Sequence, residues 1–409
     1  MFAEQILRLI AGLLVGVWVA RYLGPEKFGV FSYAIAFATI FSSIAKLGLD
    51  GIVVRDLVRE PNQRDLILGT SFWLKLGGAV VTLCIVAIAM HFTANHLTTN
   101  LYIFIIASGM TFQSFEVIDF YFQSKVLSKF VSLCKLSQLL LSSLMKIYLV
   151  LTGAELFWFV VVSLVDQATL AMSLYIAYRY QKLGSFYRKF DLKTARNLLK
   201  DSFPLIFSSL AIMIYMRIDQ IMIKEMLGDR EVGIYSAAVR LSEVWYFIPM
   251  LITRSLFPAI VNAKKVSKEL YYMRLQRLYT FMVWMAIVIA LPMTFLSDWL
   301  VTLLYGEAYR VAGQVLMINI WAGVFVFLGV ASGRWFLSEN LQKFSTMNTV
   351  MGAISNILLN LILIPKYGVY GAAISTLLSQ SIAAYFMNLA FTKTRSNFFR
   401  MTNSIFTIR

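Results

Sequence analysis

Charged side chains inside apolar segments are the residues of this sequence best placed to do chemistry. The apolar run from Phe203 to Glu243 is long enough to cross a bilayer, yet it contains Arg217 and Asp219. After a turn it continues as a second apolar run that carries Arg240 as well as Glu243. A charge at the bilayer centre costs about 2.5–3.5 kcal/mol on insertion scales, so it is usually retained for a pathway or a partner. These side chains are therefore the first candidates for a functional site.

Basic side chains outnumber acidic ones within the apolar segments and at their edges. The ten basic residues are Arg8, Lys46, Lys75, Lys135, Lys146, Arg217, Lys224, Arg240, Arg254 and Arg334. The eight acidic residues are Glu4, Asp50, Glu116, Asp119, Asp166, Asp219, Glu225 and Glu243. The excess of positive charge favours a hydrated central cavity with a positive lining.

Some of these charges can neutralise each other locally. Three pairs lie three or four residues apart and share a helix face: Glu4 with Arg8, Lys46 with Asp50, and Arg240 with Glu243. Such pairs can simply permit insertion into the membrane. Arg217 and Asp219 are two residues apart and point to different faces, so Asp219 cannot neutralise Arg217 in this way.

Two lysines lie in an apolar segment that contains no acid. Lys135 and Lys146 fall on one stripe, because eleven residues make about three helical turns. They require an anion on another helix, a water-filled cavity or a ligand. Snorkelling explains Lys146, near the predicted outer interface, better than it explains Lys75, Lys135 or Arg217.

Composition sets the class of protein. The 409 residues are 59% hydrophobic and 14% charged, and the mean hydropathy is +0.73. This predicts an all-α polytopic membrane protein. We interpret the formal charge of +16 as a topology signal and expect no nucleic-acid partner. The two cysteines lie in apolar runs and indicate no disulfide framework.

The sequence lacks the signals of an enzyme. It has no G-x-x-x-x-G-K-[ST] motif for nucleotide hydrolysis. The only histidines, His91 and His96, lie in a predicted loop, where they make a poor metal site and cannot complete a Ser/His/Asp arrangement. We therefore expect no catalytic residues, no metal and no cofactor.

Twelve membrane spans are predicted. They cover residues 2–20, 29–49, 67–90, 101–123, 128–152, 155–177, 202–225, 233–261, 276–297, 311–335, 344–364 and 369–391. Lys and Arg are concentrated after even-numbered spans and in the tail, with 22 residues against five after odd-numbered spans. This asymmetry places both termini in the cytoplasm. We interpret the first residues as a span and not as a removable signal peptide.

A repeated turn indicates duplication. Leu23-Gly24 and Gly29-Val30-Phe31-Ser32 match Leu227-Gly228 and Gly233-Ile234-Tyr235-Ser236, at an offset of 204 residues. The predicted organisation is two parallel-repeat six-helix lobes around a central cavity. The expected parts are an N-terminal lobe (1–178), a basic cytoplasmic linker (179–201), a C-terminal lobe (202–391) and a basic cytoplasmic tail (392–409).

Several stretches carry a family resemblance. They are RYLGPEKFGVFSYAIAF (21–37), MRIDQIMI (216–223), GIYSAAVRLSEVWYFIP (233–249), LYGEAYRVAGQVL (304–316) and NLILIPKYGVYGAAIST (360–376). In this order the chain resembles the Wzx-type O-antigen and polysaccharide flippases of the multidrug/oligosaccharidyl-lipid/polysaccharide exporter superfamily. The short N-terminus departs from the family pattern.

The resemblance implies a function. Such proteins move undecaprenyl-diphosphate-linked oligosaccharides from the cytoplasmic to the periplasmic face of the bacterial inner membrane, and their lumen is cationic. Arg217, Asp219 and Arg240 fit that lumen. The expected partners are the lipid-linked oligosaccharide, membrane lipids, a polysaccharide polymerase and a chain-length regulator.

We expect alternating access by rocking of the two lobes, driven by an ion gradient or by downhill substrate flow. The residues assigned to the substrate diphosphate and the cavity are Arg217, Lys135, Lys75, Arg240 and Arg8. Those assigned to gating or ion coupling are Asp219, Glu243, Glu116 and Asp119. One alternative for Arg217 is a gate formed with Glu116 or Asp119.

Three other functions stay open. A multidrug cation exporter of the same superfamily needs acidic residues in its cavity, whereas bases predominate here. A lipid II flippase needs the same positive cavity for a diphosphate, and its substrate differs only in the sugar. A non-transporting scaffold of a polysaccharide assembly complex predicts intramembrane charges that are paired locally.

Overall fold

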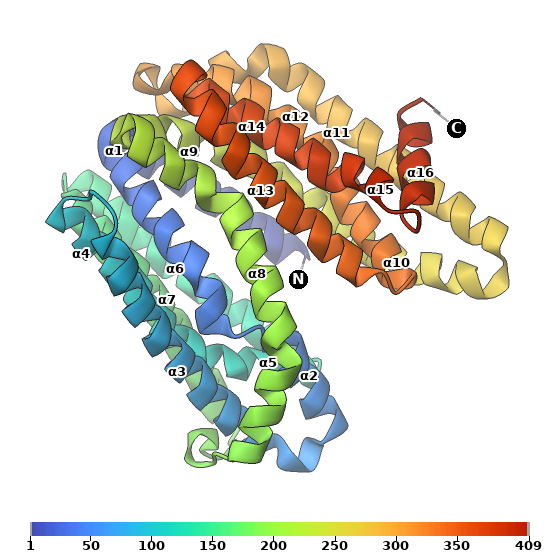
Figure 1. Ribbon diagram of the computed structural model, residues 1–409. Coiled ribbons are helices and arrows are strands. Elements are labelled where there is room, and N and C mark those ends of the chain that lie inside the picture. Colours follow the sequence, from blue (N-terminus) through green and yellow to red (C-terminus); the bar gives the residue numbers. More distant parts are fainter. Residues whose placement is uncertain (1, 407–409) are drawn as a thin grey trace. The chain divides into compact units, whose positions relative to one another are not determined.

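The computed structural model describes the backbone of residues 2–406 and the side chains of residues 7–406. The described chain is helical and contains no strand (Figure 1). Ten of its helical segments are long and apolar enough to cross a membrane. The prediction of an all-α polytopic membrane protein is therefore confirmed.

The number of crossings stays a prediction. The first of the ten segments, Leu7–Arg59, contains the predicted span 29–49 and most of the predicted span 2–20. The twelfth predicted span, 369–391, is interrupted: it forms α14 (Val369–Ser381), a π-helical turn η6 (Ile382–Phe386) and α15 (Met387–Ala390). A break of this kind is common near functional sites in helices.

The chain forms two compact units. Unit 1 contains the chain up to Leu23 together with Val30–Met213, and unit 2 contains Gly24–Gly29 together with the chain from Ile214 onward. The predicted boundaries at 178, 201 and 391 stay predictions. The helices of unit 1 are α1 (Phe2–Lys46) apart from its Gly24–Gly29 segment, α2 (Asp50–Arg59), α3 (Arg64–His91), α4 (Leu97–Ser108), α5 (Val117–Ser124), α6 (Ser128–Leu151), α7 (Leu156–Tyr180) and the first part of α8 (Leu192–Leu227). Three 3₁₀ segments belong to the same unit: η1 (Pro61–Gln63), η2 (Gly109–Glu116) and η3 (Phe186–Arg188).

Unit 2 is built from the rest of α8 and the helices that follow it. These are α9 (Asp229–Glu243), η4 (Val244–Tyr246), α10 (Phe247–Val266), α11 (Lys268–Tyr305), η5 (Glu307–Tyr309), α12 (Val311–Ser338), α13 (Gln342–Tyr367), α14, η6, α15 and α16 (Arg395–Phe406). The predicted tail thus contains a helix. Its Asn397 is buried, accepts a hydrogen bond from the Tyr279 hydroxyl at 2.6 Å and donates to Ser332 Oγ at 2.8 Å.

The repeated turn has the same backbone form in both copies. Gly24 interrupts α1 with φ 71° and ψ 168°, and Gly228 separates α8 from α9 with φ 99° and ψ −178°. Positive φ of this kind favours glycine, which has no Cβ to clash with the backbone. Pro25 follows Gly24 at a position where a new helix tolerates proline.

The two copies of the turn also touch each other inside unit 2. A Cβ on Gly29 would overlap the carbonyl of Asp229, and a Cβ on Gly233 would overlap the carbonyl of Pro25. Each glycine thus lets the backbone of the other copy approach. This contact gives a structural reason for the sequence match between the repeats.

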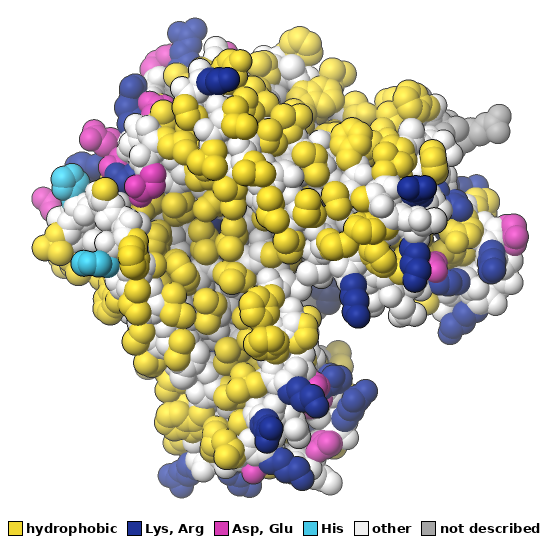
Figure 2. All heavy atoms as spheres, in the orientation of Figure 1, with side chains coloured by type: hydrophobic (Ala, Val, Ile, Leu, Met, Phe, Trp, Pro, Cys, Tyr) yellow, Lys and Arg dark blue, Asp and Glu magenta, His cyan; other side chains and the backbone are white. Residues whose placement is uncertain are grey.

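Lysine and arginine side chains gather at one end of unit 1, where α2 ends and α3 begins, while hydrophobic side chains cover the helices above it in the view of Figure 2. The basic linker lies at this end. Phe186 of η3 is buried against Phe72 and Tyr178, with ring centroids 5.7 and 5.3 Å away. The linker is therefore packed onto the start of α3, beside which it lies in Figure 1.

We predict that Gly29→Ala and Gly233→Ala lower the thermal stability and membrane abundance of the protein, because each added methyl group meets a backbone carbonyl. Gly77→Ala is the matched control. It lies inside α3 with no atom within 4 Å of its Cβ position, and alanine is favoured over glycine in helices by about 1 kcal/mol. Equal thermal unfolding temperatures for the three purified variants would contradict the close contact.

Candidate functional site

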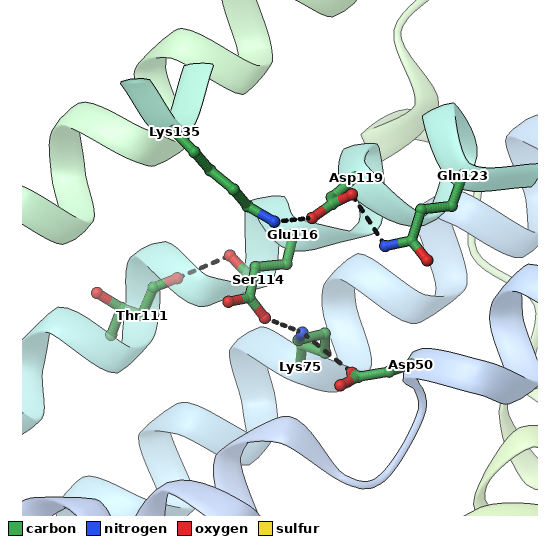
Figure 3. A network of polar contacts seen from close by, with 8 residues as sticks. All are labelled: Asp50, Lys75, Thr111, Ser114, Glu116, Asp119, Gln123 and Lys135. Carbon is green, nitrogen blue, oxygen red and sulfur yellow. Dashed lines mark hydrogen bonds and ion pairs between the residues drawn. The ribbon is translucent and has the colours of Figure 1, made fainter. Parts of the chain in front are cut away.

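Each unit contains a cluster of charged side chains with their polar partners. The Lys75 cluster of unit 1 comprises Asp50, Lys75, Glu116, Asp119 and Lys135 (Figure 3). The Asp219 cluster of unit 2 comprises Arg217, Asp219, Tyr235, Glu243, Asn360 and Thr376. Eight of the nine predicted site residues lie in the clusters or next to them. The ninth, Arg8, is half-buried in α1, and its predicted partner Glu4 lies outside the described side chains.

Lys75 is the most deeply buried member of its cluster, with 1% of its side chain exposed. Its Nζ lies 2.8 Å from Glu116 Oε2 and 4.0 Å from Asp50 Oδ1. The ammonium also lies 4.9 Å from the ring centroid of Phe120, a favourable cation–π distance. A buried ammonium with these partners is fully compensated.

Asp119 places a second carboxylate in the same cluster. Its Oδ2 lies 2.9 Å from Lys135 Nζ, and its Oδ1 accepts a hydrogen bond of 2.9 Å from Gln123. Figure 3 shows Glu116 and Asp119 on consecutive turns, each directed at a different lysine. The anion that Lys135 requires is therefore found on another helix.

The tight helical segment η2 positions these acids. Ser108, Thr111 and Ser114 recur every third residue, and each hydroxyl donates to the carbonyl three residues before it, at 2.7 Å in all three cases. Hydroxyl groups that bind nearby carbonyls bend helices or alter their geometry, and a 3₁₀ segment has three residues per turn. The eight-residue η2 ends at Glu116, so its geometry sets where that carboxylate lies.

A third lysine of unit 1 is also paired. Lys146 Nζ lies 3.0 Å from Asp166 Oδ2 on α7 and donates to Ser142 Oγ at 2.7 Å. Snorkelling is therefore not needed to explain Lys146.

In the Asp219 cluster, the guanidinium of Arg217 forms a salt bridge with the carboxylate of Glu243. Two parallel hydrogen bonds join them, from Nη1 to Oε1 and from Nη2 to Oε2, each 3.3 Å long. Charge-assisted hydrogen bonds of this type are usually 2.7–2.9 Å, so the pair is loose. About a quarter of each side chain is exposed. Arg217 is thus oriented as a fork but not tightly held.

Arg240 forms no salt bridge with Glu243 among the described side chains, although Glu243 is near enough to interact with its charge. Its guanidinium lies 4.7 Å from the ring centroid of Phe28, within unit 2. The loose partner of Glu243 is Arg217, and the acids Glu116 and Asp119 bind lysines.

Asp219 is a buried carboxylate with three donors. Its Oδ1 accepts from Asn360 Nδ2, and its Oδ2 accepts from Tyr235 Oη and Thr376 Oγ1, all at 2.6 Å. The donors come from α13, α9 and α14, so one carboxylate joins four helices, counting its own α8. Asp219 therefore holds these helices of unit 2 together, in addition to any role in binding or coupling.

A small cavity of about 30 Å³ adjoins this carboxylate and is lined by Asp219, Glu243 and Asn319 among other residues. The Oδ1 atoms of Asn319 and Asn360 are buried without a hydrogen-bond partner among the described residues. Because a water needs about 10–15 Å³ and polar partners, the cavity has room for ordered water. Two carboxylates thus share one small polar space.

The sequence reasoning missed Tyr235, Asn360 and Thr376 as site residues. All three are neutral, so a search for charges inside apolar segments passes over them. The available signal was their position in the stretches GIYSAAVRLSEVWYFIP and NLILIPKYGVYGAAIST, which were noted for other reasons.

We predict that Lys75→Met destabilises the protein by about 3–5 kcal/mol, because it leaves Glu116 without its buried partner. The double variant Lys75→Met/Glu116→Gln should regain much of this loss. Arg55→Gln is the control, since its pair with Asp201 is exposed and such pairs contribute about 1 kcal/mol or less. Denaturant unfolding of the purified proteins measures the differences, and equal stability of Lys75→Met and Arg55→Gln would refute the assignment.

Known proteins share both the sequence pattern and the fold. Residues 1–264 match the family described as "Polysaccharide biosynthesis protein", and residues 204–362 match the MatE family. The capsular polysaccharide biosynthesis protein CapF of Staphylococcus aureus is 21% identical over 94% of this chain and 95% of its own. An inward-facing MATE multidrug transporter superposes with a TM-score of 0.78 at 16% identity, covering 97% of this chain and 96% of its own. The lipid II flippase MurJ superposes with a TM-score of 0.77 at 15% identity, covering 99% of this chain and 90% of its own.

Proposed function

We propose, from the premise that this chain belongs to the polysaccharide biosynthesis protein family, that it moves undecaprenyl-diphosphate-linked oligosaccharide across the bacterial inner membrane. The family match makes it a membrane transport protein of polysaccharide biosynthesis and not an enzyme. A relative named for capsular polysaccharide biosynthesis and a fold shared with a lipid II flippase support this substrate class. The proposed direction is from the cytoplasmic face outward, with both termini cytoplasmic.

The loose pair between Arg217 and Glu243 is the observation that carries the proposal. A guanidinium fork can hold two phosphate oxygens as well as two carboxylate oxygens. Its bonds to Glu243 are long, and a quarter of each side chain is exposed. We infer that the substrate diphosphate displaces Glu243 as the partner of Arg217.

The other predicted phosphate contacts differ in how accessible they are. Lys135 is 30% exposed and can turn toward an anion while Asp119 keeps its bond to Gln123. Lys75 is buried and bonded to Glu116, and the guanidinium of Arg240 lies over the ring of Phe28. We propose Arg217 and Lys135 as direct contacts, with the other bases contributing to the positive potential.

Displacement of Glu243 provides a means of ion coupling. Once Arg217 binds phosphate, the carboxylate of Glu243 loses its hydrogen-bonded cation and lies on the same small cavity as Asp219. Two neighbouring carboxylates in an apolar medium favour uptake of a proton or a cation. Asp219 and Glu243 therefore act in coupling, while Glu116 and Asp119 hold the lysines of unit 1. Alternating access of the two lobes then carries the bound head group across.

A multidrug cation exporter is the second candidate. The MatE match covers much of unit 2, and the two acids Asp219 and Glu243 line its cavity. The two functions are separated by reconstituting the protein in vesicles and measuring flipping of a fluorescent lipid-linked oligosaccharide and efflux of a cationic dye in parallel.

We predict that Arg217→Ala lowers the rate of oligosaccharide flipping about 10- to 100-fold, since a charge-assisted contact contributes about 1.5–3 kcal/mol. Arg217→Lys should keep part of the activity, because an ammonium retains the charge without the fork. The control is Arg310→Ala, an exposed position outside both clusters.

Wild-type flipping by Arg217→Ala would refute a contact with the diphosphate. If Glu243→Arg restores transport to Arg217→Glu, transport requires the salt bridge between the two positions and not an arginine at position 217.

A further inference from the structure

An apolar groove on the surface of unit 1 belongs to neither cluster. The α3–α7 groove has a volume of about 700 Å³, within the range of about 300–1,000 Å³ typical of binding sites for small molecules. It lies between α3, η2 and α7, and the linker turn η3 borders it. Its lining includes Phe72, Trp73, Leu76, Phe115, Met172 and Ile176.

The apolar lining of the groove favours a hydrocarbon ligand. Met172 and Ile176 are 65% and 57% exposed on a helix apolar enough to span the membrane. Such side chains face lipid chains. A sugar or a phosphate placed here would lose its hydrogen bonds to water without replacement, at a cost of several kcal/mol. A single hydrocarbon chain fits the groove without this penalty.

One end of the groove has the features of a membrane–water interface. The indole Nε1 of Trp73 donates a 2.9 Å hydrogen bond to the carbonyl of Tyr187, and both residues line the groove. Trp and Tyr are enriched at head-group level because their rings are apolar and their tips polar. The buried Phe186 holds this turn against α3. The groove therefore ends at a packed element at head-group level.

Positive charge lies at that end. Arg188 and Lys189 follow Tyr187 and are exposed. The pKa of the Tyr187 hydroxyl is lowered, first by a hydrogen bond with Ser185 and also by the charge of the adjacent Arg188. Arg188 thus lies beside the end of the groove.

Lys189 lines a separate polar recess of about 350 Å³, formed with η1 and the start of α3. Its one acid, Asp65, is bound by Arg64 at 2.6 Å. An apolar groove and a basic polar recess are therefore two residues apart on the same turn.

We propose that the α3–α7 groove binds one acyl chain of an anionic phospholipid, whose phosphate is held by Arg188 and Lys189. Arginine and lysine recognise phosphate oxygens by charge-assisted hydrogen bonds. Phospholipids surround the helices in large excess, so mass action favours them over the scarcer polyprenyl chain of the transport substrate. The proposal stands independently of the transported substrate.

The bound chain would support the Lys75 cluster. Phe115 lines the groove, and the next residue, Glu116, binds Lys75. On α3, Leu76 lines the groove beside Lys75. A chain packed on Phe115 and Leu76 therefore favours the position of η2 in which Glu116 meets its lysine.

Native mass spectrometry of the purified full chain tests the proposal by titration with phosphatidylglycerol, phosphatidylcholine or decaprenyl phosphate. We expect one phosphatidylglycerol to bind at least tenfold more tightly than phosphatidylcholine. Arg188→Gln/Lys189→Gln should reduce this preference about 25-fold or abolish it, since each basic residue near a membrane surface contributes about fivefold. Lys200→Gln, an exposed change of charge on α8, is the matched control and should keep the preference.

A filled groove provides the second arm. Ala168→Trp introduces a ring into the lining and should remove the tightly bound lipid, with folding checked by circular dichroism. The double charge variant changes only exposed side chains and stays informative if Ala168→Trp does not fold. Equal binding of the two phospholipids by the wild type, or displacement of phosphatidylglycerol by equimolar decaprenyl phosphate, would overturn the proposal.

Discussion

The structure depends on the pairing of charges in an apolar environment. A buried ion without a partner costs several kcal/mol, so each charge inside these helices constrains the helix that compensates it. In unit 1, Lys75 requires Glu116, and Lys135 requires Asp119. The 3₁₀ segment η2 brings Glu116 to Lys75, and α5, which continues directly from it, brings Asp119 to Lys135.

The two clusters differ in how firmly their charges are held. Lys75, Lys135 and Lys146 have bonds of 2.8–3.0 Å to their acids, and Asp219 is held by three donors at 2.6 Å. The bonds of Arg217 to Glu243 are 3.3 Å long. A cationic side chain that binds a charged ligand must exchange its resident carboxylate for that ligand at low cost in free energy. Arg217 can do so because its bonds to Glu243 are long, while the shorter contacts stabilise the two units.

Much of the fold could be predicted from the sequence, because apolar runs of membrane length and the repeated turn at Gly24 and Gly228 are local signals. The acids that pair with Lys135 and Lys146 could not be identified, since they lie on other helices and no local spacing records that packing. The neutral donors around Asp219 could not be predicted from the sequence for another reason. Asn360 and Thr376 are far from Asp219 in sequence and carry no charge, so only the packing of α13 and α14 against α8 reveals them.

The most direct test of the exchange of Arg217 between Glu243 and phosphate is the affinity of the purified protein for undecaprenyl diphosphate. If Glu243 competes with the phosphate, Glu243→Gln binds this lipid about tenfold or more tightly than the wild type, since a lost charged hydrogen bond is worth about 1.5–3 kcal/mol. Arg217→Gln should weaken binding by a similar factor. Weaker binding by Glu243→Gln, comparable to that of Arg217→Gln, would show that the pair acts as a fixed structural unit and would contradict the exchange.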